Sequence, residues 1–133
     1  MIFRGAIVTD RGQSVGSWSA ALCRSMEDLY SSFHFGADHF ELFERHDLGT
    51  AWPLAFLISI RVDEENERRK GSGSLGMRDF LSASRAKGAR LAFARVSDPE
   101  TPSEVLSHFY TKNGWTDISE TGLPQSAYLR FAG

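Results

Sequence analysis

The sequence has only one cysteine, Cys23, among 133 residues. A single thiol cannot form an internal disulfide, and no second thiol exists to complete a cysteine-based metal cage. The sequence also has no apolar run near the roughly 20 residues that a membrane-spanning helix needs. The start, Met1 to Gly5, lacks a basic leader followed by a long apolar stretch, so no secretory signal is expected. These absences favour a soluble cytoplasmic protein with no membrane partner.

Strong net charge and metal-binding patterns are absent as well. The formal net charge of −2 gives no global attraction to phosphate backbones, so nucleic acid is disfavoured as the main partner. A local basic cluster could still hold a small anionic ligand. No two histidines have the helical i, i+4 spacing with an accompanying acid, and no metal is expected; the four are His34, His39, His46 and His108.

The length and composition fit one globular domain covering residues 1–133. The apolar fraction of 41% and the charged fraction of 24% are ordinary for such a domain. Phe3 to Thr9 is a β-rich run that predicts a strand, and apolar residues from Ser14 to Tyr30 recur at helical spacing. Cys23 lies on the apolar side of that predicted helix, where a buried, unreactive thiol is expected. His39 to Arg45 alternates as a strand does.

The second half of the chain gives clearer patterns. Leu54 to Val62 is almost wholly apolar and β-branched, which predicts a central strand buried on both faces. Helical periodicity resumes at Leu75 and ends at Lys87-Gly88. Arg90 to Val96 predicts a second strand that could lie beside the first.

The last third begins with a helix-start signature. In Thr101-Pro102-Ser103-Glu104 we interpret Thr101 as the cap and Pro102 as the first helical residue. Asn113-Gly114 ends this helix, and two closing strands are expected at Trp115 to Ser119 and Ser126 to Phe131.

A basic, glycine-containing segment follows the predicted central strand. Its sequence is Arg68-Arg69-Lys70-Gly71-Ser72-Gly73-Ser74. Free backbone N–H groups and the positive end of a helix meet here, which favours binding of a phosphate or pyrophosphate. The alternative is that the glycines only make a tight turn beside a solvated charged face. The pattern lacks the Gly-Lys-Ser/Thr ending of nucleotide-hydrolase phosphate loops and the context of a dinucleotide-binding turn.

Two motifs resemble those of the GNAT superfamily of N-acyltransferases. The family's Arg/Gln-x-x-Gly-x-Gly/Ala is matched by Arg68-x-x-Gly71-x-Gly73. Its Phe-Tyr-x-Lys-x-Gly-Phe is matched by Phe109 to Trp115, except at the last aromatic. The resemblance implies an α/β (α+β) fold in which helices flank a mixed, mostly antiparallel sheet with a splayed central strand pair.

The resemblance also implies an activity and a set of site residues. Acetyl-CoA would be the acyl donor, and its acetyl group would pass to a primary amine by direct attack. The backbone of Arg68, Arg69, Lys70, Gly71, Ser72, Gly73 and Ser74 would hold the coenzyme A pyrophosphate. Ile60 and Val62 would lie beside the pantetheine arm, and Ser103 stands where the family often has asparagine. Tyr110 would protonate the departing sulfur; the alternative is a core aromatic.

Other roles stay open at this level. The predicted central strand contains no carboxylate, and Glu41, Glu44 and His39 are weak candidates for a general base. Trp18, Phe33, Phe35 and Trp52 either line an acceptor pocket or belong to the core. The acceptor is a small-molecule or peptide amine, and a homodimer is an open alternative because the N-terminal half looks compact for the family. An alternative function is a catalytically degenerate acyl-CoA-binding interaction or sensor module.

Overall fold

The computed structural model describes residues 1–33, 35–63, 71–96, 101–118 and 122–132. A six-stranded sheet has the order β1-β2-β3-β4-β6-β5. Only β3 and β4 are parallel neighbours, and every other pair is antiparallel, as the resemblance implied. The strands are β1 Ile2–Val8, β2 Ser14–Cys23, β3 Leu54–Val62, β4 Leu91–Arg95, β5 Thr116–Ile118 and β6 Ser126–Arg130.

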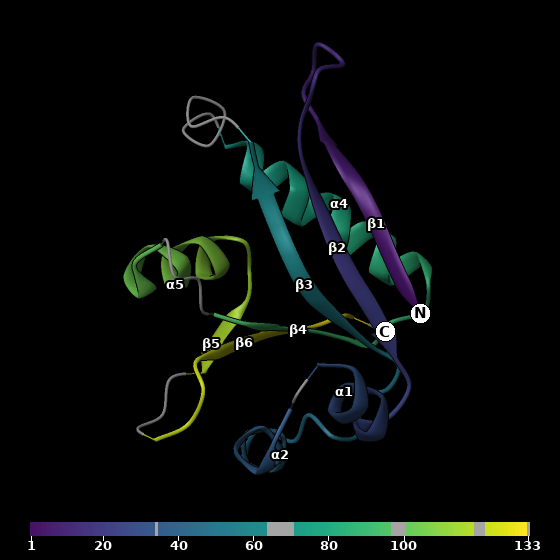
Figure 1. Cartoon of the computed structure of the whole chain (residues 1–133), viewed down its shortest axis with the longest axis vertical. Helices are drawn as coiled ribbons and strands as arrows, with labels where there is room; N and C mark the ends of the chain where they lie inside the picture. Colours follow the sequence, from purple (N-terminus) through teal and green to yellow (C-terminus); the bar gives the residue numbers. More distant parts are fainter. Residues whose placement is uncertain (34, 64–70, 97–100, 119–121, 133) are drawn as a thin grey trace.

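Helices cover both faces of this sheet (Figure 1). They are α1 Met26–Phe33, α2 Ala37–Arg45, α4 Ser72–Ala86 and α5 Ser103–Lys112. On one face, α4 and α5 bury Phe80 and Tyr110 against strand residues such as Trp18. On the other face, α1 and α2 form a second core with strand residues such as Phe56 and Phe93. The sheet therefore lies between two helical layers.

The helix predicted from Ser14 to Tyr30 is wrong. Ser14–Cys23 is β2, which pairs with β1 on one edge and β3 on the other, and helix α1 begins only at Met26. Trp18 and Leu22 are four residues apart, a spacing that places side chains on one face of a helix but equally on one face of a strand. Pairing with β1 and β3 on both edges favours the strand over the helix.

The strand predicted from His39 to Arg45 is also wrong, because this segment lies within α2. Its buried residues are His39, Leu42 and Phe43, which follow the i, i+3, i+4 spacing of a helical face. Arg45 donates to Glu41 one turn earlier at 2.5 Å, an ion pair that only a helix brings together. The alternation over seven residues was too short to exclude a helix.

Later predictions agree better with the structure. Strand β3 has the predicted bounds, and β4 lies beside it in parallel register. Helix α5 begins one residue later than expected: Pro102 is its N-cap, without a side-chain cap bond, so the prediction of Thr101 as cap was wrong. Within the described ranges, no helix is long and apolar enough to cross a membrane.

Candidate functional site

The two parallel strands part in the middle of the sheet. The ladder between β3 and β4 runs from the pair Leu54–Leu91 to the pair Leu57–Ala94 and stops there. Strand β3 continues along β2, whereas β4 continues along β6 (Figure 1). A register shift opposite Ser19 and Ala20 leaves Ile58 as an extra residue in β3, a bulge at the point of separation. The splayed strand pair expected from the sequence is therefore present.

The fork leaves one edge of β3 without a strand. Among the described residues, no strand pairs with Ile58, Ser59, Ile60 or Arg61 on the side of β4. Backbone N–H and C=O groups at such an edge can hydrogen-bond an extended ligand. Ile60 is half-buried and packs against α4, while Val62 is buried in the core under α4 and α5. These two predicted site residues thus lie where the strands diverge.

Helix α4 begins close behind this fork along the chain. Its N-cap, Gly71, has the left-handed backbone conformation (φ 83°, ψ 18°), which favours glycine. The N–H groups of Ser74 and Leu75 both donate to the carbonyl of Gly71, at 3.1 and 3.3 Å. The first N–H groups of an α-helix have no intrahelical partner. The positive end of a 15-residue helix is therefore presented here.

The structure places Gly71, Ser72, Gly73 and Ser74 together in the cap and first turn of α4. Ser72 is buried. The predicted contacts of Arg68, Arg69 and Lys70 lie outside the described residues.

Gly73 also has a packing reason to be glycine. A Cβ atom there would lie 3.2 Å from Cε1 of the Phe109 ring. One turn away, Asn113 Nδ2 donates to Ser74 Oγ at 3.3 Å. The first turn of α4 and the last turn of α5 are therefore in contact, and substitutions at Gly73 act on this contact as well as on any bound anion.

Tyr110 lies in the core beneath α5, with only 6% of its surface exposed. Its ring makes edge contacts with Trp115 (5.1 Å between centroids) and Phe109 (5.6 Å). Burial raises the pKa of its phenol to about 12, because the charged form loses hydration. At neutral pH the group is therefore a proton donor and not a base. These contacts are those of a core aromatic, and the role of Tyr110 as acid stays a prediction.

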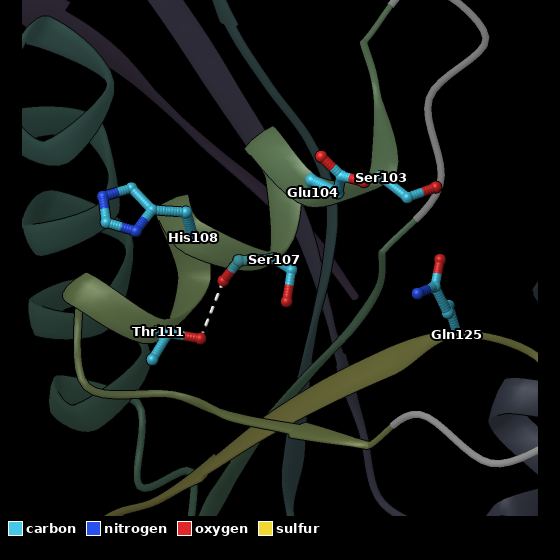
Figure 2. A pocket seen from close by; sticks show the side chains of 6 residues that line it. All are labelled: Ser103, Glu104, Ser107, His108, Thr111 and Gln125. Atoms are coloured by element: carbon cyan, nitrogen blue, oxygen red, sulfur yellow. Dashed lines mark hydrogen bonds between the residues drawn. The ribbon is translucent and has the colours of Figure 1, made fainter.

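Ser103 is the first residue of α5 and lies two turns before Tyr110 on the same side of the helix. It opens a polar pocket of about 430 Å³ between α5 and the start of β6 (Figure 2). The other lining residues are Glu104, Ser107, His108, Thr111 and Gln125. The sequence analysis missed this pocket, although hydroxyl residues recur every fourth position along this face of α5.

The half-buried carboxylate of Asp117 is bonded to a residue that lines the pocket. Ser107 Oγ donates to Asp117 Oδ2, and Thr111 Oγ1 donates to the carbonyl of Ser107 at 2.7 Å (Figure 2). The second oxygen of Asp117 is buried and has no hydrogen-bond partner among the described residues. The hydroxyl of Ser107 is thus the group that keeps this carboxylate in place.

The candidate bases lie on α2, away from the strand that holds the fork. His39 is buried and stacks on Phe35 at 4.3 Å; burial and the nearby Arg95 lower its pKa. Glu41 is engaged by Arg45, and Glu44 is exposed. No group of three or more potential metal ligands occurs in the described parts of the chain.

The remaining sequence candidates belong mainly to the core. Trp18 is buried under α4 and donates its Nε1 hydrogen to Asp79 at 2.7 Å. Phe33, Phe35 and Trp52 pack on the opposite face, so the four aromatics do not line one pocket. Cys23 is buried in β2, and burial raises its pKa to about 11, which keeps the thiol protonated and unreactive.

Comparisons with known proteins agree with this architecture. No family model matches the sequence, and no curated protein matches it significantly. An acetyltransferase structure from Bacillus cereus is similar with a TM-score of 0.59 and 15% identity, over 98% of this chain and 74% of that one. The PaiA N-acetyltransferase from Thermoplasma acidophilum, solved with coenzyme A, gives 0.60 and 14%, over 98% and 61%.

A protein of comparable length also has a similar structure. The anti-CRISPR protein AcrVA5 matches with a TM-score of 0.55 and 12% identity, over 94% of this chain and 96% of that one. A GNAT-family acetyltransferase from Listeria monocytogenes gives 0.62 and 12%, over 96% and 64%. With the forked parallel strands and the glycine-capped helix that follows them, these similarities establish that this chain has the fold of the GNAT acetyltransferases.

Proposed function

We propose that this protein is an acetyl-CoA-dependent N-acetyltransferase that transfers the acetyl group to a primary amine. The observation that carries the proposal is the fork between β3 and β4, with the glycine-capped start of α4 close behind it. The fork offers the unpaired edge of β3 to the amides of a pantetheine arm. The start of α4 offers backbone N–H groups and the positive end of the helix to a pyrophosphate.

The proposal assigns a role to each site residue predicted from the sequence. The backbone of Gly71, Ser72, Gly73 and Ser74 holds the pyrophosphate, together with the backbone of Arg68, Arg69 and Lys70, which lie outside the described residues. The edge of β3 around Ile60 and Val62 binds the pantetheine arm and polarises the thioester carbonyl through a backbone N–H. Ser103 supplies a hydroxyl near the coenzyme.

In the reaction, a neutral amine attacks the thioester carbonyl carbon, a C–N bond forms and the C–S bond breaks. The departing sulfur takes the proton of the Tyr110 hydroxyl, and the ammonium proton of the product passes through water to restore the phenol. The raised pKa of Tyr110 keeps the phenol protonated at neutral pH, which is the state that a proton donor needs.

A second candidate is an acyl-CoA-binding module without catalysis. It is favoured by one observation: β3 carries no carboxylate, and the candidate bases on α2 are buried against aromatics, ion-paired or exposed on the helix. This candidate shares the coenzyme site with the enzyme, so turnover and not binding separates them.

The binding test uses calorimetry with acetyl-CoA and coenzyme A on the wild type and on two variants at one position. Gly73→Ala and Gly73→Glu both place a Cβ against Phe109, but only glutamate adds an anion beside the proposed pyrophosphate. We expect the alanine variant to lose little affinity and the glutamate variant to lose about tenfold to a hundredfold. Equal affinity of the two variants, or no binding by the wild type, would contradict the proposed site.

The catalytic test compares Tyr110→Phe with Tyr30→Phe in an assay of released thiol over a panel of amines. Tyr30 is exposed on α1 and serves as the matched control. We expect Tyr110→Phe to lower kcat by roughly tenfold to a thousandfold with unchanged acetyl-CoA affinity. Unaltered kcat removes the acid role, and absence of turnover in the wild type with intact binding favours the binding module.

A further inference from the structure

Part of one face of the sheet is not covered by a helix among the described residues. Helices α1 and α2 pack on the strand ends near Cys23 and Leu54, whereas the upper parts of β1, β2 and β3 carry a helix only behind them (Figure 1). Alternating residues on this open face are solvent-exposed, and no residue of β1 contributes to the core under α1 and α2. The residues that define the open face are Ile2, Arg4, Ala6, Val8, Ser17, Ser19, Ser59 and Arg61.

The charged residues within strands β1, β2 and β3 are all positive, and the exposed Asp63 comes directly after β3. Strands β1, β2 and β3 contain no aspartate or glutamate, and their two charged residues are Arg4 and Arg61. Both arginines are exposed, and neither makes an ion pair within the described part of the chain. Between them, Ser19 and Ser59 hydrogen-bond to each other at 2.8 Å. Two exposed guanidinium groups beside hydroxyls, without an ion pair among the described residues, can bind carboxylates.

The spacing of the arginines indicates the size of the ligand. Arg4 pairs with Ser19, and Arg61 pairs with Ser17, so the two arginines are separated by two strand spacings and two residues along the strands. These offsets correspond to about 12 Å between the two Cα atoms. A small amine cannot reach both groups, whereas about four residues of an extended polypeptide can.

The open face also runs directly to the fork. Arg61 and Ser59 lie on the part of β3 beyond its last pair with β4, which is the edge where the proposed acetyl transfer takes place. A chain lying on the face would therefore approach the thioester from the side of the sheet opposite to α4.

We propose that the acceptor is a polypeptide whose acidic residues bind Arg4 and Arg61 and thereby bring a nearby lysine or N-terminal amine to the fork. This inference rests on the proposed acetyltransferase function and names the acceptor class for it. The acidic polypeptide is a substrate, and the open face is its docking surface.

The test uses the full chain loaded with coenzyme A and a set of fluorescein-labelled peptides that carry one lysine. One peptide has aspartate and glutamate at spacings of about four residues, and its matched isostere has asparagine and glutamine there. Fluorescence anisotropy measures binding to the wild type, to the double variant Arg4→Gln/Arg61→Gln and to Arg90→Gln. Arg90 is an exposed arginine outside the three strands and serves as control.

We expect the acidic peptide to bind the wild type and Arg90→Gln at least about fivefold more tightly than the isostere, and the double variant to lose this preference. The preference should also decline as ionic strength rises. Equal binding of both peptides, a preference that survives in the double variant, or tighter binding of a single-stranded oligonucleotide would each overturn the inference.

Thiol release from acetyl-CoA with the same peptides separates the two proposals. Arginine-dependent binding without transfer to the peptide amine refutes the polypeptide acceptor, whereas turnover with the amine panel tests the acetyltransferase itself. Equal transfer to acidic and neutral peptides supports the enzyme and refutes the acidic acceptor.

Discussion

The buried phenol of Tyr110 makes the stability of this protein depend on pH in the alkaline range. Burial raises its pKa from 10.0 to about 12 in the folded chain. The unfolded chain therefore releases this proton at lower pH than the folded chain does. The contribution to stability is complete below pH about 10 and is lost as the pH rises through about 12. Each unit of difference between the folded and unfolded pKa corresponds to about 1.4 kcal/mol. The unfolding free energy should therefore fall by about 2.7 kcal/mol between pH 10 and 12.

The assay is urea unfolding followed by tryptophan fluorescence at several pH values, for the wild type and Tyr110→Phe. All other titrating groups, Cys23 included, are common to both proteins and cancel in the difference between their unfolding free energies. We expect this difference to shrink by about 1.4 kcal/mol per pH unit above pH about 10, whereas Tyr30→Phe should follow the wild type because Tyr30 is exposed. A difference that does not change with pH would refute the reasoning.

Three further predictions concern packing and buried polar groups. Gly16→Ala places a Cβ 2.1 Å from a backbone oxygen of β3, so it should lower the unfolding free energy by about 1–3 kcal/mol. Gly49→Ala is the control: its Cβ meets no atom within 4 Å, and it should change the unfolding free energy by less than about 0.5 kcal/mol. Ser107→Ala should cost about 1–3 kcal/mol in urea unfolding, because it removes the partner of the Asp117 carboxylate. The Cys23 thiol should react with an aromatic disulfide reagent only after unfolding in urea, and fast reaction of the native protein would contradict its burial.

The sequence predicted the second half of the fold because its signals there are local. Leu54 to Val62 is a long apolar run with clear ends, and the structure gives β3 the same bounds. The end of α5 at Asn113 and Gly114 could also be predicted. Gly114 has a φ of 90°, and the local turn alone requires this conformation. Such signals survive folding because they act within one turn of backbone.

The first half could not be predicted in the same way. In Ser14–Cys23, the alternating residues Trp18, Ala20 and Leu22 lie on the α4 face of a strand, but the sequence alone fits a helix as well. Pairing with β1 and β3 on its two edges makes this segment a strand, and no local sequence pattern indicates that pairing. The contact between Gly73 and Phe109 was invisible for the same reason, because α4 and α5 meet only in the folded chain.

Strand β3 explains why one apolar run can serve both the core and the candidate site. Its first half, Leu54 to Leu57, is buried throughout because β2 and β4 pair with it on both edges and helices cover both faces. Beyond the bulge at Ile58, β4 departs and the outer face is open, so Ser59 and Arg61 alternate with the more buried Ile60 and Val62. The prediction that the whole strand is buried on both faces was therefore wrong beyond Leu57. Burial changes there from continuous to alternating, because β4 departs and β3 alone continues as one side of the fork.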